Sequence, residues 1–443
     1  MSGLARQAFT VLFGRGVVRV AQFVAFLVLA RLLSPTDFGW FGILTSAITL
    51  AATLGSLGLR QSFAYEIGQD RITPGQAAGT SLALWPVLSL IAAAVIFAVY
   101  GRQISGIAPA VAAVIILLGV SGAILHTLLQ GIFLGRGVIW AFSLSDALPR
   151  ITLMLGVLAI AFMGVMTLDL ALWVQVGSYL ITLPVIVVLA VWQTGPLGTA
   201  FRRLLPMLRY GLIFALNLFL VTLCSRLSMF VIEATSGADS AGQFFAAIRV
   251  NEIFLEIATA LGMVLFSNAV RSTDSASSIK RGIDIASWLF WLFMLLAVPV
   301  SLLAPSVLTL LIGSEYAGAV PALQILAFSL APTAASRMVY PTLAGSGSPF
   351  FGTPVIAMSL MLNGALALIL VPQFGIAGGA IAVTVGQYAL LVGYAITCRI
   401  RFNIPIHALF LPRWGQIKQI GSGLISRLRK RREGPGDEKV GDI

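Results

Sequence analysis

Long runs of apolar residues recur along the whole chain, and they constrain its fold more than any other feature. A run of about 20 residues can cross the hydrocarbon core of a bilayer as a helix, whereas membrane β-strands alternate over roughly ten residues. Only 10% of the 443 residues are charged, against about 25% in a typical soluble domain. The sequence therefore predicts an all-α integral membrane protein. The predicted spans are residues 9–33, 38–59, 77–100, 107–134, 143–165, 170–192, 209–234, 241–270, 283–312, 319–344, 352–371 and 375–398.

Two stretches of the sequence share one layout, which indicates an internal repeat. Residues 31–60 and 235–262 each contain a short polar turn, a glycine, an aromatic residue and a long apolar helix. Gly39 corresponds to Gly242 at an offset of 203, and two further matches follow in order at offsets of 210 and 209. Two six-helix units would share one orientation around a central cavity, because six spans return the chain to its starting side. The predicted domains are an N-terminal six-helix lobe (1–192), a basic cytoplasmic linker (193–208), a C-terminal six-helix lobe (209–398) and a basic cytoplasmic tail (399–443) with an amphipathic segment and a disordered end.

The basic residues are distributed unevenly between the two sides of these spans. With the N-terminus placed in the cytoplasm, twenty Lys and Arg residues fall in cytoplasmic segments or the tail, and only Arg31 and Arg102 fall on the opposite side. Basic residues accumulate in cytoplasmic loops, so both termini are predicted to be cytoplasmic. This bias and contact with anionic membrane lipids account for the net charge of +12, and no nucleic acid partner is expected.

The connections between the spans are too short to hold a soluble catalytic domain. The longest cytoplasmic connections are residues 60–76 and 193–208. The sequence contains no Walker loop, no HExxH and no GxSxG motif. Cys224 and Cys398 both lie inside apolar runs, where neither a disulfide framework nor a metal site is indicated. These features predict a protein that is not an enzyme and that uses no cofactor or metal.

Charged residues inside the apolar runs are candidates for function, because an ionisable group in a membrane span is costly. Two glutamates of the eighth span, Glu252 and Glu256, are candidates for coupling transport to a proton, since a carboxylate in a poorly hydrated cavity can exchange one. A polar stripe on the second span, with steps of three and four residues, comprises Ser46, Thr49, Thr53, Ser56 and Arg60. The candidate substrate-binding residues are Arg15, Arg19, Arg60, Arg226, Arg249 and Arg337.

Structural roles compete with these functional ones. Arg15 could extend its side chain to the inner interface, and Arg249 could pair with Glu252 three residues later on the same helix. For Asp146 and Arg150, four residues apart on the fifth span, we favour a structural ion pair. Three neutral polar residues could equally join helices by hydrogen bonds; they are His126, Asn217 and Asn363.

Several segments resemble polysaccharide flippases of the O-antigen (Wzx-like) type. The segment LARLLSPTDFGWFGILTSAITLAATLGSLGLRQSF resembles their opening, and LLIGSEYAGAVPALQILAFSL, LAGSGSP and VPQFGIAGGAIAVTVGQY resemble later parts in the same order. The resemblance spans residues 9–398 and indicates the multidrug/oligosaccharidyl-lipid/polysaccharide exporter superfamily. It implies a V-shaped, two-lobed bundle in the bacterial inner membrane. The carried sugar does not follow from it.

The resemblance implies a function in surface polysaccharide biosynthesis, such as that of lipopolysaccharide O-antigen or exopolysaccharide. The protein would move an undecaprenyl-diphosphate-linked oligosaccharide from the cytoplasmic to the periplasmic leaflet by alternating access, with a polysaccharide polymerase and export machinery as partners. Arg15 and Arg19 from one lobe and Arg249 from the other would hold the diphosphate, since arginine offers paired donors to its oxygens.

Two other functions compete with the flippase. A cation-coupled multidrug antiporter on the same scaffold would need acidic residues in its cavity, whereas arginines outnumber glutamates among the deep charges. A membrane polysaccharide polymerase or ligase would need a large outer loop to carry its chemistry, and the predicted outer loops are short.

Overall fold

The protein is helical along almost all of the chain that the structure describes. The computed structural model describes residues 3–104, 106–256, 258, 275–345 and 352–411. The predicted amphipathic segment and disordered end of the tail lie outside these residues. The α-helices are α1 (Gly3–Leu32), α2 (Pro35–Gly55), α3 (Leu59–Gly68), α4 (Pro74–Tyr100), α5 (Pro109–Gly135), α6 (Ile139–Met163), α7 (Leu168–Thr194), α8 (Leu204–Phe254), α10 (Ser275–Leu311), α11 (Val320–Ala327), α12 (Leu330–Gly345) and α13 (Thr353–Phe402). Short 3-10 helices are η1 (Phe201–Arg203), η2 (Ser314–Ala319) and η3 (Ile406–Leu409).

Among the described residues, eight helices are long and apolar enough to cross a membrane, and the bent pair formed by η2–α11 and α12 makes a ninth span. Helices α8 and α13 contain 51 and 50 residues, more than twice the length that one crossing needs. Each is broken at a glycine with positive φ, Gly237 in α8 and Gly375 in α13, a conformation that glycine adopts without steric cost. With the halves of α8 and α13 counted separately and α1 added, the described helices provide the twelve predicted spans.

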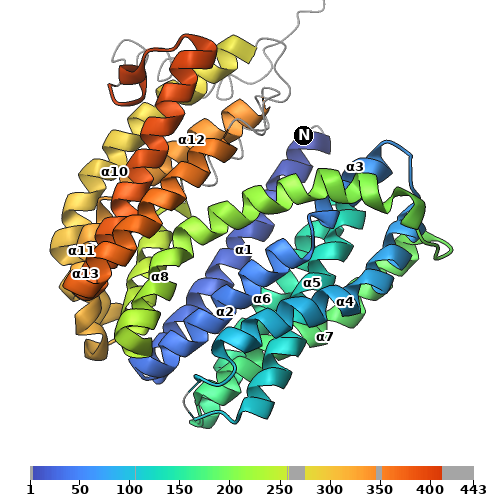
Figure 1. Cartoon of the computed structure of the whole chain (residues 1–443), viewed down its shortest axis with the longest axis horizontal. Helices are drawn as coiled ribbons and strands as arrows, with labels where there is room; N and C mark the ends of the chain where they lie inside the picture. The colour runs from blue at the N-terminus through green and yellow to red at the C-terminus, as the bar shows by residue number, and fades with distance from the viewer. Residues whose placement is uncertain (1–2, 105, 257, 259–274, 346–351, 412–443) are drawn as a thin grey trace, which may run out of the picture.

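The helices form two groups that diverge from a shared contact, as Figure 1 shows. Helices α1, α2 and α4–α7 make one group, and α10–α13 make the other. Helix α8 joins them. In its first half, residues near Gly211 pack on α3 and residues near Cys224 pack on α13. Its second half, after the break, packs on α2. The predicted all-α, two-lobed bundle is therefore confirmed. The lobe limits at residues 192 and 209 stay a prediction.

The predicted linker lies against the first group of helices. Gly198 donates its backbone N–H to the carbonyl oxygen of Gly75 (3.2 Å), and Ala200 donates its own to the hydroxyl of Thr80 (2.8 Å). A Cβ atom on Gly79 would lie 1.9 Å from the carbonyl oxygen of Gly198, so only glycine permits this approach. The linker is therefore held to α4 before α8 begins at Leu204.

The connection between the second and third spans contains a helix that the apolar pattern did not indicate. Helix α2 ends at Gly55, the chain turns through Leu57 and Gly58 with positive φ, and α3 follows. A Cβ atom on Gly58 would lie 1.9 Å from the carbonyl oxygen of Gly211 in α8. The turn therefore brings α3 against α8. It also places Arg60 on α3, so the prediction that Arg60 continues the polar stripe of the second span was wrong.

Candidate functional site

The two repeat glycines lie at the contact between the two groups of helices. A Cβ atom on Gly39 would lie 2.0 Å from the carbonyl oxygen of Ala238, and one on Gly242 would lie 1.9 Å from that of Pro35. Ala238 is offset from Pro35 by the same 203 residues that separate the two glycines. The contact is therefore nearly symmetric, with each glycine receiving the backbone of the other helix. This placement confirms that Gly39 and Gly242 are equivalent.

Aromatic side chains and polar contacts surround this glycine contact and close one end of the molecule. The ring of Phe38 lies 5.1 Å from that of Phe245 and 5.9 Å from that of Tyr316. The Tyr316 hydroxyl donates to the carbonyl oxygen of Leu33 (3.4 Å). Arg31 donates to the carbonyl oxygen of Leu311, the last residue of α10 (2.8 Å), where a cation also complements the helix dipole. We call this contact, from Arg31 to Phe41 and from Ala238 to Phe245, the closed end.

A central cavity of about 670 Å³ begins beside the closed end and lies between the first group and α8. Its walls come from α1, α2, α6 and α7 of the first group and from both halves of α8. This volume lies within the range of about 300–1,000 Å³ typical of ligand sites. Its charged lining residues are Arg19, Arg150, Arg226, Arg249, Glu252 and Glu256.

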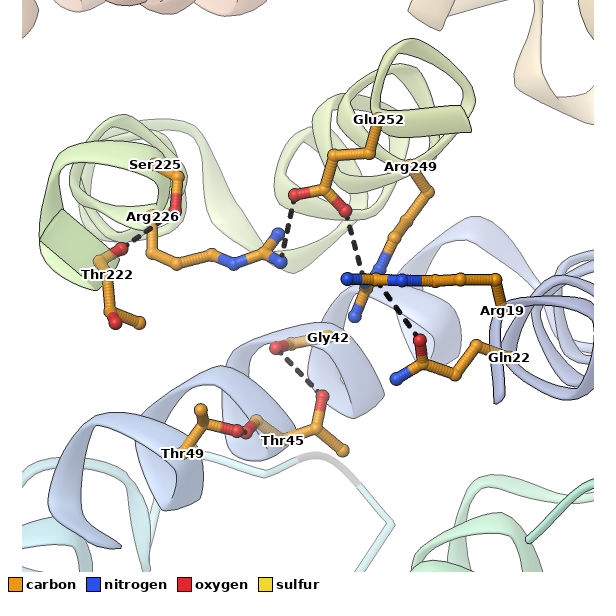
Figure 2. A network of polar contacts seen from close by, with 10 residues as sticks. All are labelled: Arg19, Gln22, Gly42, Thr45, Thr49, Thr222, Ser225, Arg226, Arg249 and Glu252. Carbon is orange, nitrogen blue, oxygen red and sulfur yellow. Dashed lines mark hydrogen bonds and ion pairs between the residues drawn. The ribbon is translucent and has the colours of Figure 1, made fainter. Parts of the chain in front are cut away.

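Three of the predicted arginines converge on the two predicted glutamates, as Figure 2 shows for four of these residues. Glu252 accepts from Arg226 at 3.1 Å and from Arg249 at 3.0 Å. Arg19 of α1 pairs with Glu256 at 2.9 Å and also donates to the side chain of Gln22. The cluster therefore joins the first helix to both halves of α8. Three cations face two anions, which leaves an excess of positive charge.

The environment of the cluster differs between its members. The side chain of Arg226 is only 12% exposed, and its Nη1 atom has no hydrogen-bond partner among the described residues. Arg249 lies over the ring of Phe245, with the guanidinium carbon 4.9 Å from the ring centroid, a favourable cation–π position. Arg19 is about half exposed, at 49%. A ligand entering the cavity can therefore reach Arg19 with little rearrangement.

Hydroxyl groups of α2 cover the opposite wall of the cavity. Thr45 donates to the carbonyl oxygen of Phe41 (2.7 Å), and Thr49 donates to that of Thr45 (2.8 Å). Figure 2 shows both threonines on α2, across from the charged cluster. Their donors are used within the helix, so the oxygen lone pairs remain for a ligand. Of the predicted stripe, Ser46 and Thr49 line the cavity.

The structure does not bring all the predicted binding residues together. Arg60 donates to the side chain of Gln130 on α5 (3.3 Å) and lines neither cavity of the described structure. Arg337 donates to the carbonyl oxygen of Leu255 and lines a second cavity. Arg15 lies on α1, but its side chain is outside the described part of the chain, so its role stays a prediction.

The structural interpretations weighed from the sequence describe several contacts correctly. Arg150 pairs with Asp146 at 2.9 Å, and Arg249 pairs with Glu252, as noted above. The ring of His126 is buried, with Nε2 3.2 Å from the carbonyl oxygen of Tyr179. Two amides join α8 to α13: Asn217 accepts from Thr353, and Asn363 donates to the carbonyl oxygen of Cys224.

The second cavity, of about 650 Å³, was missed by the sequence analysis. It lies among α8, α12 and α13 and shares Val221, Ser225 and Glu252 with the central cavity. A signal for it exists in the sequence, because polar residues of the tenth span recur at steps of four, three and four: Ser329, Thr333, Ser336 and Tyr340, with Arg337 next to Ser336. Arg150, which we had interpreted only as structural, also lines the central cavity.

Comparison with known protein families gives one match. Residues 4–267 match the family described as "Polysaccharide biosynthesis protein". This region covers the first group of helices and α8, and so contains the whole charged cluster, whereas Arg337 lies outside it. No curated protein matches the sequence significantly.

Solved transporter structures share the fold. The lipid II flippase MurJ, in an inward closed conformation, superimposes with a TM-score of 0.68 at 12% identity, over 97% of this chain and 93% of that chain. An inward-facing multidrug resistance MATE family transporter of the MOP superfamily gives 0.65 at 19% identity, over 91% and 98%. A MOP superfamily transporter from Pyrococcus furiosus gives 0.63 at 19% identity, over 91% and 95%. The family match and this fold confirm the resemblance seen in the sequence motifs.

Proposed function

Because the chain belongs to the polysaccharide biosynthesis protein family, we propose that it is a flippase for an undecaprenyl-diphosphate-linked oligosaccharide in the bacterial inner membrane. The observation that carries this proposal is the convergence of Arg19, Arg226 and Arg249 on one cavity between the first group of helices and α8. On this proposal the protein transports without chemistry of its own. It acts in surface polysaccharide biosynthesis beside a polymerase and export machinery.

The charged cluster suits a diphosphate that must be bound and then released. A diphosphate offers several acceptor oxygens, and arginine presents planar paired donors that match them. Glu252 and Glu256 pair with these donors in the structure, so an entering diphosphate exchanges one set of ion pairs for another. Arg19 is the first contact because it is the most exposed of the three. Such exchange limits the net affinity and keeps the head group from being trapped.

The direction of transport is proposed from the closed end and from the distribution of basic residues. The positive-inside bias supports a periplasmic position for the closed end, with Arg31. The cavity would then receive its substrate from the cytoplasmic side, where the lipid-linked unit is made. An inside-negative membrane potential favours outward movement of each negative charge by about 2.3 kcal/mol per 100 mV.

A cation-coupled antiporter for cationic drugs is a weaker candidate. Such a cavity needs carboxylates that are free to bind a cation. Glu252 is held by two arginines, and Glu256 is held by Arg19. The excess charge of the cluster is positive, which would repel a cationic drug.

Two substitutions at Arg19 test the proposal. In proteoliposomes that contain the lipid-linked oligosaccharide fraction of the producing cells, Arg19→Ala should lower the flipping rate at least tenfold. Arg19→Lys should retain much of the rate if charge suffices, and should fail like alanine if paired donors are required. Arg102→Ala is the control, because Arg102 is an exposed residue outside the cavity. Wild-type flipping by Arg19→Ala at normal protein levels would overturn the site.

Labelling of single cysteines tests the proposed topology. Ser314, at the start of η2, and Gln69, at the end of α3, are both exposed. In intact cells a membrane-impermeant thiol reagent should label Ser314→Cys and leave Gln69→Cys unlabelled. Labelling only at position 69 would reverse the orientation, and the proposed direction of transport would fall with it.

A further inference from the structure

The second cavity has a composition that differs from that of the central one. Its polar lining consists largely of amides and hydroxyls, from Asn217, Asn251, Ser329, Thr333, Ser336 and Gln387. Two tyrosines, Tyr340 and Tyr394, and a set of aliphatic side chains also line it, and its charged lining residues are Glu252 and Arg337. Neutral hydrogen-bonding groups beside aromatic rings suit a ligand that has many hydroxyls and no charge of its own.

Two polar atoms in this cavity lack partners in the described part of the chain. Asn251 donates from Nδ2 to the Ser329 hydroxyl (3.2 Å), but its Oδ1 atom accepts nothing, and the residue is only 6% exposed. The Ser336 hydroxyl is likewise without a partner at 6% exposure. An unsatisfied buried polar group costs free energy, and a ligand that satisfies it recovers that cost. Both residues line the cavity, where a ligand could reach them.

The two cavities are connected through a shared wall at the charged cluster. Val221, Ser225 and Glu252 line both of them, and Asn251 of the second cavity is adjacent in sequence to Glu252. A head group anchored at the arginines therefore has a second compartment within reach. The volume of about 650 Å³ falls in the range of ordinary small-molecule sites.

We propose that the second cavity is the sugar-recognition site of the transporter, and that it receives the sugar next to the diphosphate while the arginines of the central cavity hold the diphosphate. This inference rests on the proposed function. Asn251 Oδ1 accepts a hydrogen bond from a sugar hydroxyl. The Ser336 hydroxyl donates a hydrogen bond to the sugar or accepts one from it. A site built from such groups rejects analogues that lack the matching hydroxyl, so this cavity, more than the arginines, decides which oligosaccharide is carried.

Other occupants fit the cavity less well. A metal cation would need free carboxylates, and among the described residues the only acidic one that lines this cavity is Glu252, which two arginines already hold. A polyprenyl chain would leave Asn251 Oδ1 and the Ser336 hydroxyl unsatisfied, at a cost in free energy. A sugar satisfies the polar atoms and also packs on the aromatic rings.

The test compares binding of two lipids to the purified full-length chain in nanodiscs. The probes are undecaprenyl diphosphate and the lipid-linked oligosaccharide fraction extracted from the producing cells. Ser336→Ala should weaken binding of the oligosaccharide lipid about fivefold, the loss expected for one hydrogen bond of about 1 kcal/mol, and leave undecaprenyl diphosphate unchanged. Thr333→Leu, which fills cavity space from a half-buried position, should abolish the preference for the glycosylated lipid.

The matched control is Ser287→Ala. Ser287 on α10 is also a buried serine whose hydroxyl has no partner among the described residues, but it lines neither cavity. It should change binding of neither lipid. Arg19→Ala should weaken both lipids, because both carry the diphosphate.

Three other outcomes would contradict either the sugar site or the proposed function. If Ser336→Ala and Thr333→Leu bind both lipids like the wild type while Arg19→Ala weakens both, the sugar site is wrong and the proposed function stands. If the wild type binds neither lipid, the proposed function itself fails. If the variants change the Na⁺ or pH dependence of binding without changing the preference between the lipids, the cavity holds a coupling ion and the inference is overturned.

Discussion

Helix α2 and the second half of α8, residues 238–254, occupy equivalent places but differ in chemistry. They meet through Gly39 and Gly242, and each receives the backbone of the other. Farther along the two helices, the repeat offset of 203 makes Ser46 equivalent to Arg249 and Thr49 equivalent to Glu252. One helix therefore presents hydroxyl groups to the central cavity, and its equivalent presents charges.

This difference separates the requirements of the scaffold from those of the substrate. Two helices that close against each other need small residues at the same position on both sides, so the glycines are symmetric. A ligand with one charged end needs its counter-charges on one side, so the chemistry is asymmetric. Arg19 of α1 completes the charged side by pairing with Glu256 across the cavity. Equivalent substitutions in the two helices should therefore change stability unequally where one helix carries a charge and the other a hydroxyl. They should change stability equally at the two glycines.

The largest difference is expected between Glu252→Ala and its equivalent, Thr49→Ala. Glu252 neutralises Arg226, whose side chain is only 12% exposed, and Arg249. Removing one partner of a buried ion pair leaves an uncompensated charge, so Glu252→Ala should lower the free energy of unfolding by about 3–5 kcal/mol. Thr49 is exposed to the cavity and donates only to its own helix. Its loss should cost less than about 0.5 kcal/mol.

Thermal unfolding in one detergent would measure both variants. Glu252→Gln is a useful intermediate, because the amide oxygen can still accept from one arginine while the negative charge is lost. Equal unfolding temperatures for Glu252→Ala and Thr49→Ala would show that the two side chains contribute equally to stability, and would contradict the expected difference between the two helices.

At the glycines the two helices should respond alike. A Cβ atom at either Gly39 or Gly242 would lie within about 2 Å of a carbonyl oxygen of the other helix, so alanine at either position should destabilise the closed end by about 1–3 kcal/mol. A disulfide between cysteines at Thr36 and Asp239, whose side-chain oxygens lie 3.5 Å apart, reports this contact. Its yield should fall by about fivefold or more in Gly39→Ala and in Gly242→Ala.

Gly177→Ala controls for the general effect of replacing a glycine within a span. Gly177 lies in α7, and the nearest atom that its Cβ would meet is 4.0 Å away. The disulfide yield should stay at the wild-type level in this variant. A fall at only one of the two repeat glycines would break the symmetry of the closed end.

The fold could be predicted from the sequence because each span carries its own signal. Twelve apolar runs are visible one at a time; the break in α8 falls between two runs that were predicted separately, and the break in α13 falls at the first residue of the last run. Helix α3 and the turn before it could not be predicted. Leu57 adopts a positive φ that its side chain disfavours, and the close packing of Gly58 on Gly211, far apart in the sequence, accompanies this turn.

The candidate site was predictable only in part, for a related reason. Ionisable residues stand out within apolar runs, which identified Arg19, Arg226 and Arg249 as candidates. Their partners depend on which helices meet, so the pairing of Arg19 with Glu256 was not foreseen. The second cavity was missed because serine and threonine are ordinary residues of membrane helices. Their helical spacing on the tenth span is therefore a weak signal, and it gains meaning from the structure, where Ser336 faces the same space as Asn251 of α8.

The smallest effect is expected at Glu256, where the two sides of the cavity are joined by a single exposed pair. Arg19 and Glu256 are 49% and 31% exposed, and exposed ion pairs contribute about 0–1 kcal/mol. Glu256→Gln should therefore leave the unfolding temperature nearly unchanged. It should release Arg19 for the diphosphate, so that undecaprenyl diphosphate binds up to about fivefold more tightly, the equivalent of about 1 kcal/mol.

The pH dependence of the same variant distinguishes a coupling role from simple neutralisation. If Glu256 exchanges a proton during transport, the flipping rate of the wild type should depend on the external pH, and this part of the dependence should disappear in Glu256→Gln. Flipping in proteoliposomes, measured over a series of external pH values, shows whether the rate follows. If Glu256→Gln flips its lipid like the wild type at every pH, Glu256 serves only to neutralise Arg19, and the proton takes no part in transport at this residue.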